Sequence, residues 1–323
     1  MLRVIAAVLV GLCATLLPGA PALAAPGPTG NGAWAVGPAT TSSTLTPRLY
    51  FSLEGRPGDV IRDTVRVWNH TAKKMTFQVY PADGYNTPRD GAFALRTAEE
   101  AQKGVGLWTK VGEDEISVPA GRALDVPFTV TIPDNATPGE HIGGVVVANK
   151  AIERAEQAGG ATIGLRRAVG ARVYLRVSGT LVPGVRIDGL RVENTEPELP
   201  WGGPKGTVIK YTVANVGNVR LTPSIHVKAT GLFGRVLRDF PARGLPELLP
   251  GQSLDLELPW AGAPPADKVT VVAELSTRGG LQSVARTGYT TLPWQTLVAV
   301  SVLALAVLLL VRLRRRLTAR RKA

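Results

Sequence analysis

Cysteine, histidine and aromatic residues are scarce in this sequence, and each shortage excludes a class of site. The only cysteine among 323 residues is Cys13, inside an N-terminal apolar segment, so the rest of the chain has neither a disulfide framework nor a thiolate metal site. The three histidines, His70, His141 and His226, have no partner at metal-ligand spacing. We therefore expect no metal ion and no cofactor.

The motifs of common enzyme active sites are also missing. The chain has no Gly-x-Ser-x-Gly elbow and no glycine-rich phosphate loop. Its acidic run, Glu113-Asp114-Glu115, is typical of a solvated loop, whereas glycoside hydrolysis needs two carboxylates held about 5–9 Å apart across a cleft. We expect no catalytic residues and a protein that is not an enzyme.

Acidic residues are fewer than basic ones, but the excess of positive charge comes mainly from one end of the chain. Of the 37 basic residues, one lies in the N-terminal segment and seven lie in the C-terminal tail, which leaves 29 in the middle, where all 25 acidic residues also lie. The middle therefore carries a net charge of only +4, against +12 for the whole chain. This balance gives no reason to expect a nucleic-acid partner.

The first 24 residues have the parts of a secretory signal. These parts are a charged start, a short apolar run and a small-residue cleavage site: Arg3, residues 4–17, and Ala22-Leu23-Ala24. We predict a signal peptide over residues 1–24, with an uncleaved anchor helix as the alternative. Residues 25–46 are dense in Pro, Gly, Ser and Thr, which predicts a flexible lead.

The C-terminal end predicts a membrane span over residues 293–313. From Leu297 to Val311 only Ser301 interrupts the apolar residues, and about 20 residues cross ~30 Å of hydrocarbon. Trp294 stands at the outer edge, where indole rings favour the interface. Basic residues follow at once and are expected at the inner interface: Arg312, Arg314, Arg315 and Arg316.

This basic cluster fixes the expected orientation. The positive-inside rule places the tail, residues 314–323, in the cytoplasm and the rest of the chain outside the cell. We predict a single-pass protein of the cell membrane whose ectodomain faces the cell wall. A sortase substrate would need a Leu-Pro-x-Thr-Gly motif before the helix, and Leu292-Pro293 is followed by Trp294 without the Thr-Gly bond.

The middle of the chain predicts an all-β fold. Apolar and polar residues alternate in several short segments, as in strands that bury one face: residues 75–79, 124–132, 173–177, 209–213 and 254–258. Turn signals separate these segments, and no long amphipathic helix is present. We predict two immunoglobulin-like β-sandwiches, over residues 47–182 and 183–292.

The first of these domains resembles the peptidoglycan-binding domain of WxL-interacting proteins, in its high-GC Gram-positive form. The resemblance spans roughly residues 47–180 and rests on a series of short motifs: Pro57-Gly58, Val65-Arg66-Val67-Trp68-Asn69, Phe77-Gln78-Val79-Tyr80, Gly91-Ala92-Phe93, Trp108, Val118-Pro119-Ala120-Gly121, Pro138-Gly139 and Gly143-Gly144-Val145. It implies a non-enzymatic surface protein that binds peptidoglycan. In that family the second domain is associated with binding host or partner proteins.

Five residues of the first domain are candidates for glycan binding. Sugars present C–H faces to aromatic rings, while polar groups fix their orientation. The candidates combine both kinds of group: Tyr80, Asp83, Tyr85, Asn86 and Trp108. We expect Tyr80 on the outward face of a strand and Tyr85 and Asn86 in the loop that follows. The alternatives are a plain turn for the loop residues and core packing for Trp108.

Two functions remain open at this point. One is a membrane-anchored protein whose first domain binds peptidoglycan or another cell-wall glycan. The other is a protein–protein interaction module or stalk, in which exposed sheet edges recruit a secreted partner by strand addition.

Overall fold

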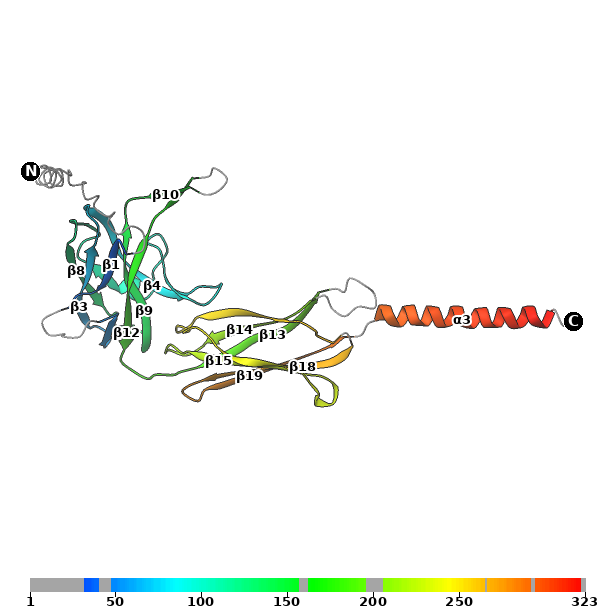
Figure 1. Ribbon diagram of the computed structural model, residues 1–323. Helices are drawn as coiled ribbons and strands as arrows, with labels where there is room; N and C mark the ends of the chain where they lie inside the picture. Colours follow the sequence, from blue (N-terminus) through cyan, green and yellow to red (C-terminus); the bar gives the residue numbers. More distant parts are fainter. Residues whose placement is uncertain are drawn as a thin grey trace, which may run out of the picture.

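The computed structural model describes residues 32–40, 48–156, 162–195, 206–264, 266–291 and 294–320. Two immunoglobulin-like β-sandwiches lie in succession and one helix follows them (Figure 1), which confirms the all-β class. The predicted signal peptide, residues 1–24, and the last three residues of the predicted tail lie outside the described residues.

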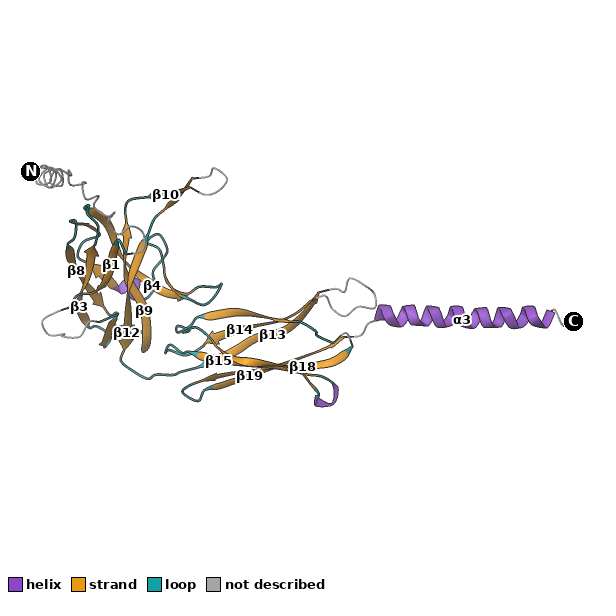
Figure 2. Ribbon diagram, viewed as in Figure 1, coloured by secondary structure: helices purple, strands orange, loops and turns teal. Residues whose placement is uncertain are grey.

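The first sandwich packs two sheets face to face (Figure 2). One sheet has the strand order β1 (Trp34–Pro38), β3 (Val60–Asn69), β8 (Ala123–Thr131) and β6 (Thr109–Val111). The other has the order β2 (Phe51–Gly55), β12 (Ala168–Val177), β9 (Gly139–Asn149), β4 (Met75–Asn86) and β5 (Phe93–Leu95), with β7 (Glu115–Val118) also paired to β4. A short helix, α2 (Val105–Trp108), precedes β6, and a hairpin of β10 (Glu153–Glu156) and β11 (Thr162–Leu165) follows β9.

The alternation in the sequence accounts for the packing of this sandwich. In β8, Val126, Phe128 and Val130 are buried, while the residues between them are exposed or half-buried. Phe128 meets Phe51 of the facing sheet edge to face, with ring centroids 4.9 Å apart. Successive strand side chains point to opposite faces, so the apolar set of each strand lies in one core.

The described residues of the second sandwich form seven strands in two sheets. One sheet has the order β13 (Val185–Thr195), β14 (Gly206–Asn215) and β17 (Ser253–Trp260). The other has the order β16 (Val236–Gly244), β15 (Pro223–Thr230), β18 (Asp267–Thr277) and β19 (Gln282–Thr291). A 3-10 turn, η2 (Leu232–Gly234), joins β15 to β16.

The predicted flexible lead is wrong where the structure describes it. Residues 34–38 form β1, which pairs antiparallel with β3 from Trp34↔Asn69 to Pro38↔Val65. Trp34 is 7% exposed and its ring centroid lies 4.8 Å from that of Phe77. The buried indole and its smaller buried neighbours Ala33, Pro38 and Ala39 fix this short segment, although its Pro- and Gly-rich surroundings give no strand pattern.

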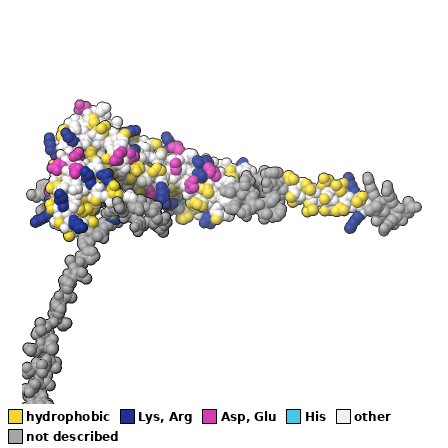
Figure 3. Space-filling view, turned by 90° about the horizontal axis from the view of Figure 1, so that it is seen from above, with side chains coloured by type: hydrophobic (Ala, Val, Ile, Leu, Met, Phe, Trp, Pro, Cys, Tyr) yellow, Lys and Arg dark blue, Asp and Glu magenta, His cyan; other side chains and the backbone are white. Residues whose placement is uncertain are grey.

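The C-terminal helix α3 runs from Trp294 to Arg320, so it continues through most of the predicted tail. Its segment Leu297–Arg314 has a mean hydropathy of 2.4 and none of it is buried inside the protein, which makes it long and apolar enough to span a membrane. Figure 3 shows its apolar shaft, with basic side chains where the shaft ends. On the face seen there, basic and acidic side chains are interspersed over the sandwiches.

Candidate ligand-binding groove

Helix α2 owes its position to the carboxylate of Asp83. Asp83 is 8% exposed and accepts the backbone N–H groups of Lys103, Gly104 and Gly106, the last two at 3.0 and 2.7 Å. The backbone N–H of Asp83 in turn donates to Gln102 Oε1 at 2.7 Å. These contacts tie the start of α2, and the residues just before it, to the end of β4.

Two glycines allow α2 to lie directly on the sheet. A Cβ at Gly106 would lie 2.7 Å from the backbone nitrogen of Asp83, and a Cβ at Gly143 would lie 2.8 Å from Cβ of Val105. Both distances are shorter than real Cβ contacts, so only glycine permits this approach. The close packing leaves Trp108, the last residue of α2, at a fixed place on the surface.

Trp108 packs on the core with one side and faces a groove with the other. Its ring lies against His141 of β9, with centroids 4.6 Å apart and planes at 52°. Nε2 of His141 is 2.8 Å from the carbonyl oxygen of Thr137, which fixes the imidazole. The indole is half-buried and also contacts the core cluster of the first sandwich.

The groove beside Trp108 has a volume of about 890 Å³. It is lined by an indole, an imidazole, two lysines and several shorter polar and apolar side chains: Lys103, Leu107, Trp108, Thr109, Lys110, Thr131, Pro133, Asn135, Ala136, Thr137 and His141, with the backbone of Gly104. No acidic side chain is among these described lining residues. The groove therefore offers an aromatic surface, cationic groups and hydrogen-bonding groups, but no carboxylate pair for glycoside hydrolysis.

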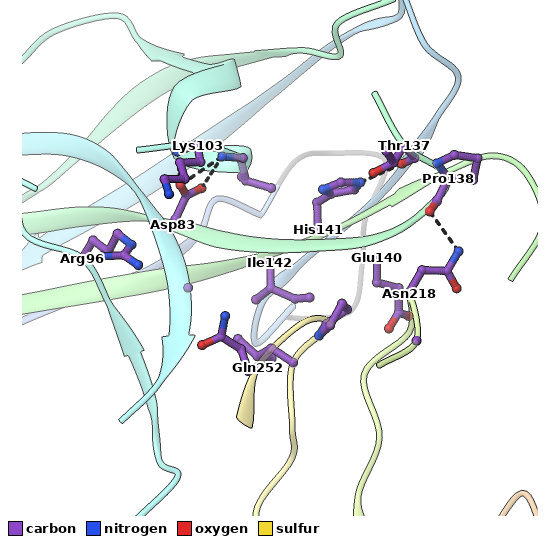
Figure 4. A pocket seen from close by; sticks show the side chains of 16 residues that line it. Asp83, Arg96, Lys103, Thr137, Pro138, Glu140, His141, Ile142, Asn218 and Gln252 are labelled. Carbon is purple, nitrogen blue, oxygen red and sulfur yellow. Dashed lines mark hydrogen bonds between the residues drawn. The ribbon is translucent and has the colours of Figure 1, made fainter. Parts of the chain in front are cut away.

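A second, smaller cavity of about 410 Å³ opens between the two sandwiches and shares Lys103, Thr137 and His141 with the groove. Figure 4 shows Asp83 bonded to the backbone at Lys103 and Asn218 reaching the carbonyl of Pro138. The side chains of Asp83, Glu140 and Asn218 in this cavity therefore hold protein groups together. We take the groove at Trp108, not this cavity, as the candidate binding site.

The candidates Asp83 and Asn86 have structural roles. The expected loop position of Tyr85 and Asn86 is wrong, because β4 runs unbroken through Asn86 while β9 and then β5 pair with it. Asn86 is 4% exposed and bridges the sandwiches: its Nδ2 donates to the carbonyls of Gly91 and Glu247, and its Oδ1 accepts the N–H of Leu249.

The tyrosine candidates lie outside the groove. Tyr80 is half-buried on the outward side of β4, as expected, and burial raises the pKa of its hydroxyl. Tyr85 lies under the guanidinium of Arg96, 5.5 Å from its ring centroid. Neither ring is among the residues that line the groove or the smaller cavity. Of the five candidates, only Trp108 lines the groove.

Sequence reasoning missed the partners of Trp108. His141 comes from β9, while Lys103 and Lys110 flank α2 in the chain. The lysines could have been found from their spacing of five and two residues around the indole. Three strands, β6, β7 and β8, lie between Trp108 and His141 in the chain, so no local pattern joins them.

At the C-terminal end of the chain, α3 begins at Trp294, the residue expected at the outer membrane interface. Arg312 and Arg314 lie exposed in its C-terminal half. Arg315 and Arg316 belong to the same helix, but their side chains lie outside the described residues.

We predict that Asp83→Ala detaches α2. The change leaves three backbone N–H groups without their acceptor, and a buried unsatisfied donor costs about 1–3 kcal/mol. We expect the free energy of unfolding to fall by about 3 kcal/mol, together with the loss of the near-ultraviolet circular dichroism of Trp108. Asp114→Ala, which removes an exposed loop carboxylate, is the control. Equal stability of the two variants would refute the role given to Asp83.

The chain matches no protein-family model and no curated protein. Several solved structures of fimbrial assembly proteins are similar at low identity. A chain of the chaperone–tip adhesin complex of CFA/I fimbriae is 12% identical, with 80% of this chain and 99% of that chain covered and a TM-score of 0.36. A chain of the CsuC–CsuE pre-assembly complex from Acinetobacter baumannii is 10% identical, with 74% and 95% covered and a TM-score of 0.36.

The CupB2 chaperone of Pseudomonas aeruginosa is 13% identical, with 74% of this chain and 97% of that chain covered and a TM-score of 0.30. At such TM-scores the likeness supports no argument about ligand, partner or activity. The function must therefore be argued from the residues of this chain.

Proposed function

We propose that this protein is a non-enzymatic, membrane-anchored surface protein whose first sandwich binds peptidoglycan or a similar cell-wall glycan in the groove at Trp108. The observation that carries the proposal is the pairing of an immobilised indole with Lys103 and Lys110 in a groove lined by no described acidic side chain. An indole face suits the C–H face of a sugar ring, and the lysines suit the carboxylates of peptidoglycan stem peptides.

The anchor in this proposal is α3. Its apolar segment Leu297–Arg314 matches the thickness of a bilayer core at 1.5 Å per residue. The basic residues after it would hold the C-terminus in the cytoplasm, with the sandwiches on the wall side. The groove lies in the first sandwich, which the second sandwich separates from α3 in the chain. This position suits a ligand in the cell wall, beyond the membrane.

A secreted protein partner is the second candidate, and the edge strand β19 favours it. β19 ends its sheet, has ten residues and contains no proline, although β13 of the facing sheet lies against part of it, where Ile187 donates its N–H to Ser283 Oγ. Such a strand can accept another strand from a partner. The opposite edge strand, β16, is less suitable because Pro241 and two register shifts interrupt it.

Retention of the full chain on insoluble peptidoglycan, in detergent, tests the proposal. We expect retention at ~0.1 M salt and a substantial retained fraction at ~1 M salt, where the Debye length shrinks from about 10 to about 3 Å. The indole contact is not electrostatic and should persist, whereas Lys103→Gln with Lys110→Gln should remove the salt-sensitive part. Retention that vanishes at moderate salt would contradict specific recognition, and no retention at all would favour the protein partner.

A further inference from the structure

The loop between β15 and β16 forms an exposed apolar tip on the second sandwich. It lies at the same end of this sandwich as the start of α3 (Figure 2). The tip consists of Leu232, Phe233 and Val236, which are 51%, 98% and 53% exposed. Phe233 has φ 58° and ψ 22°, and it is the one non-glycine residue with positive φ among the described residues. This backbone conformation is unfavourable for a bulky side chain, so the loop holds Phe233 outward against its local preference.

The loop is held in this shape by Asp267. The side chain of Asp267 is 4% exposed, and it accepts the N–H of Leu232 at 2.9 Å and Nη2 of Arg235 at 2.7 Å. A Cβ at Gly231 would lie 2.5 Å from Oδ2 of Asp267, so glycine is needed for this approach. Asp267 is the first residue of β18, which ties the tip to the sheet that ends in β19.

These hydrogen bonds also set how the loop responds to acid. The N–H of Leu232 and the guanidinium of Arg235 hold the pKa of Asp267 below its ordinary value of 3.8. A lowered folded pKa means that the carboxylate stabilises the loop at neutral pH, and this contribution is lost only as the pH falls through the folded pKa. The tip is therefore fixed at any pH above about 4.

The tip lies close to the start of the apolar helix. Asp267 pairs with Thr291, the last residue of β19, and only Leu292 and Pro293 separate Thr291 from Trp294. Three Cα–Cα steps span at most about 11 Å, and β15 and β19 both flank β18 at strand spacings of about 4.8 Å. Figure 2 shows η2 at the same end of the second sandwich as the helix.

We propose that the tip of Leu232, Phe233 and Val236 inserts into the outer leaflet of the membrane and fixes the tilt of the sandwiches above it. This inference rests on the proposed membrane span of α3. An aromatic ring with an adjacent arginine suits the boundary of acyl chains and phosphate headgroups, and Arg235 is 67% exposed beside the tip. With α3, the tip gives the ectodomain a second attachment point, so that its orientation no longer depends on a two-residue link.

The test uses single cysteines labelled with an environment-sensitive dye in the full chain, with Cys13→Ser as background, reconstituted in phosphatidylcholine–phosphatidylglycerol vesicles. Leu232→Cys reports on the tip and keeps Phe233, while Ser301→Cys reports on α3. Arg278→Cys is the matched control, because it is exposed in the turn at the opposite end of the β18–β19 hairpin. Nitroxide lipids labelled near the headgroup or deep in the acyl chains act as quenchers.

We expect the dye at Leu232→Cys to emit at shorter wavelength and to be quenched several-fold more by shallow than by deep nitroxides, with Arg278→Cys unaffected. Adding Phe233→Ser should reduce the quenching at Leu232→Cys by at least half. Deep quenching at Ser301→Cys together with a water-like dye at Leu232→Cys would overturn the inference and leave the anchor intact. A water-like dye at Ser301→Cys would instead refute the membrane span, and the tip proposal with it. A shorter emission wavelength at Leu232→Cys that neither nitroxide lipid quenches, and that depends on the protein-to-lipid ratio, would identify a protein contact and contradict lipid insertion.

Discussion

Trp108→Ala is expected to weaken binding of soluble peptidoglycan fragments about 30-fold. Truncation of a central aromatic residue typically costs about 2 kcal/mol of binding free energy or more, which corresponds to this factor at room temperature. Trp108 is the one aromatic ring other than His141 among the described residues that line the groove. Isothermal titration of the full chain in detergent with a purified disaccharide–peptide measures the effect.

Two variants separate loss of the ligand contact from loss of the fold. Tyr85→Ala removes an aromatic ring that lies outside the groove, so its Kd should equal that of the unchanged chain. Glu113→Ala, at an exposed position just after β6 and outside the groove, should likewise leave the Kd unchanged. If Tyr85→Ala and Trp108→Ala weakened binding equally, the ligand would lie on the outer face of β4 and the groove assignment would be wrong.

Asn86→Ala is expected to loosen the two sandwiches from each other. The substitution leaves the N–H of Leu249 and the carbonyls of Gly91 and Glu247 without partners, and we expect a loss of about 3 kcal/mol in unfolding free energy. The hydrogen bonds that remain at the junction are more exposed than those of Asn86, and they include Arg220 N–H to Glu140 Oε2 at 2.8 Å and Asn218 Nδ2 to the carbonyl of Pro138 at 2.9 Å. Differential scanning calorimetry should show one transition split into two.

The distance between the sandwiches gives a second readout of the same change. Spin labels at Ala123→Cys and Arg286→Cys, both exposed, place one label on each sandwich. Asn86→Ala should broaden the distance distribution, whereas Asn149→Ala, which removes a buried amide that bonds only within the first sandwich, should destabilise the chain without broadening it. A narrow distribution in Asn86→Ala would contradict the bridging role.

Most of the fold follows from the sequence, because the strands bury one face each. Val126, Phe128 and Val130 alternate with outward residues in both sequence and structure. The same rule fails for residues 34–38, where burial of Trp34 and of the two ends of the segment, not a periodic pattern, fixes the strand. Asp83-Gly84 is a dipeptide typical of a turn, but it stays extended within β4 because β9 pairs with Asp83 and β5 pairs with Gly84.

The candidate site was less predictable, because its residues meet only through tertiary packing. Trp108 could be named from its chemistry, but Asp83 and Asn86 have polar side chains for structural reasons that appear only when the buried N–H groups are located. The contact between Trp108 and His141 depends on two glycines that let α2 approach the sheet. Spacing along the chain contains no signal for such an approach.

The most direct test of the groove assignment is fluorine NMR of the full chain labelled with 5-fluorotryptophan in detergent micelles. The chain has six tryptophans, and Trp→Phe substitutions assign their resonances one by one. If the first sandwich binds cell-wall glycan in the groove, a soluble peptidoglycan fragment should shift the resonance of Trp108 in a saturable way and leave that of buried Trp34 unchanged. An unchanged Trp108 resonance at a fragment concentration that saturates binding would show that the ligand lies elsewhere.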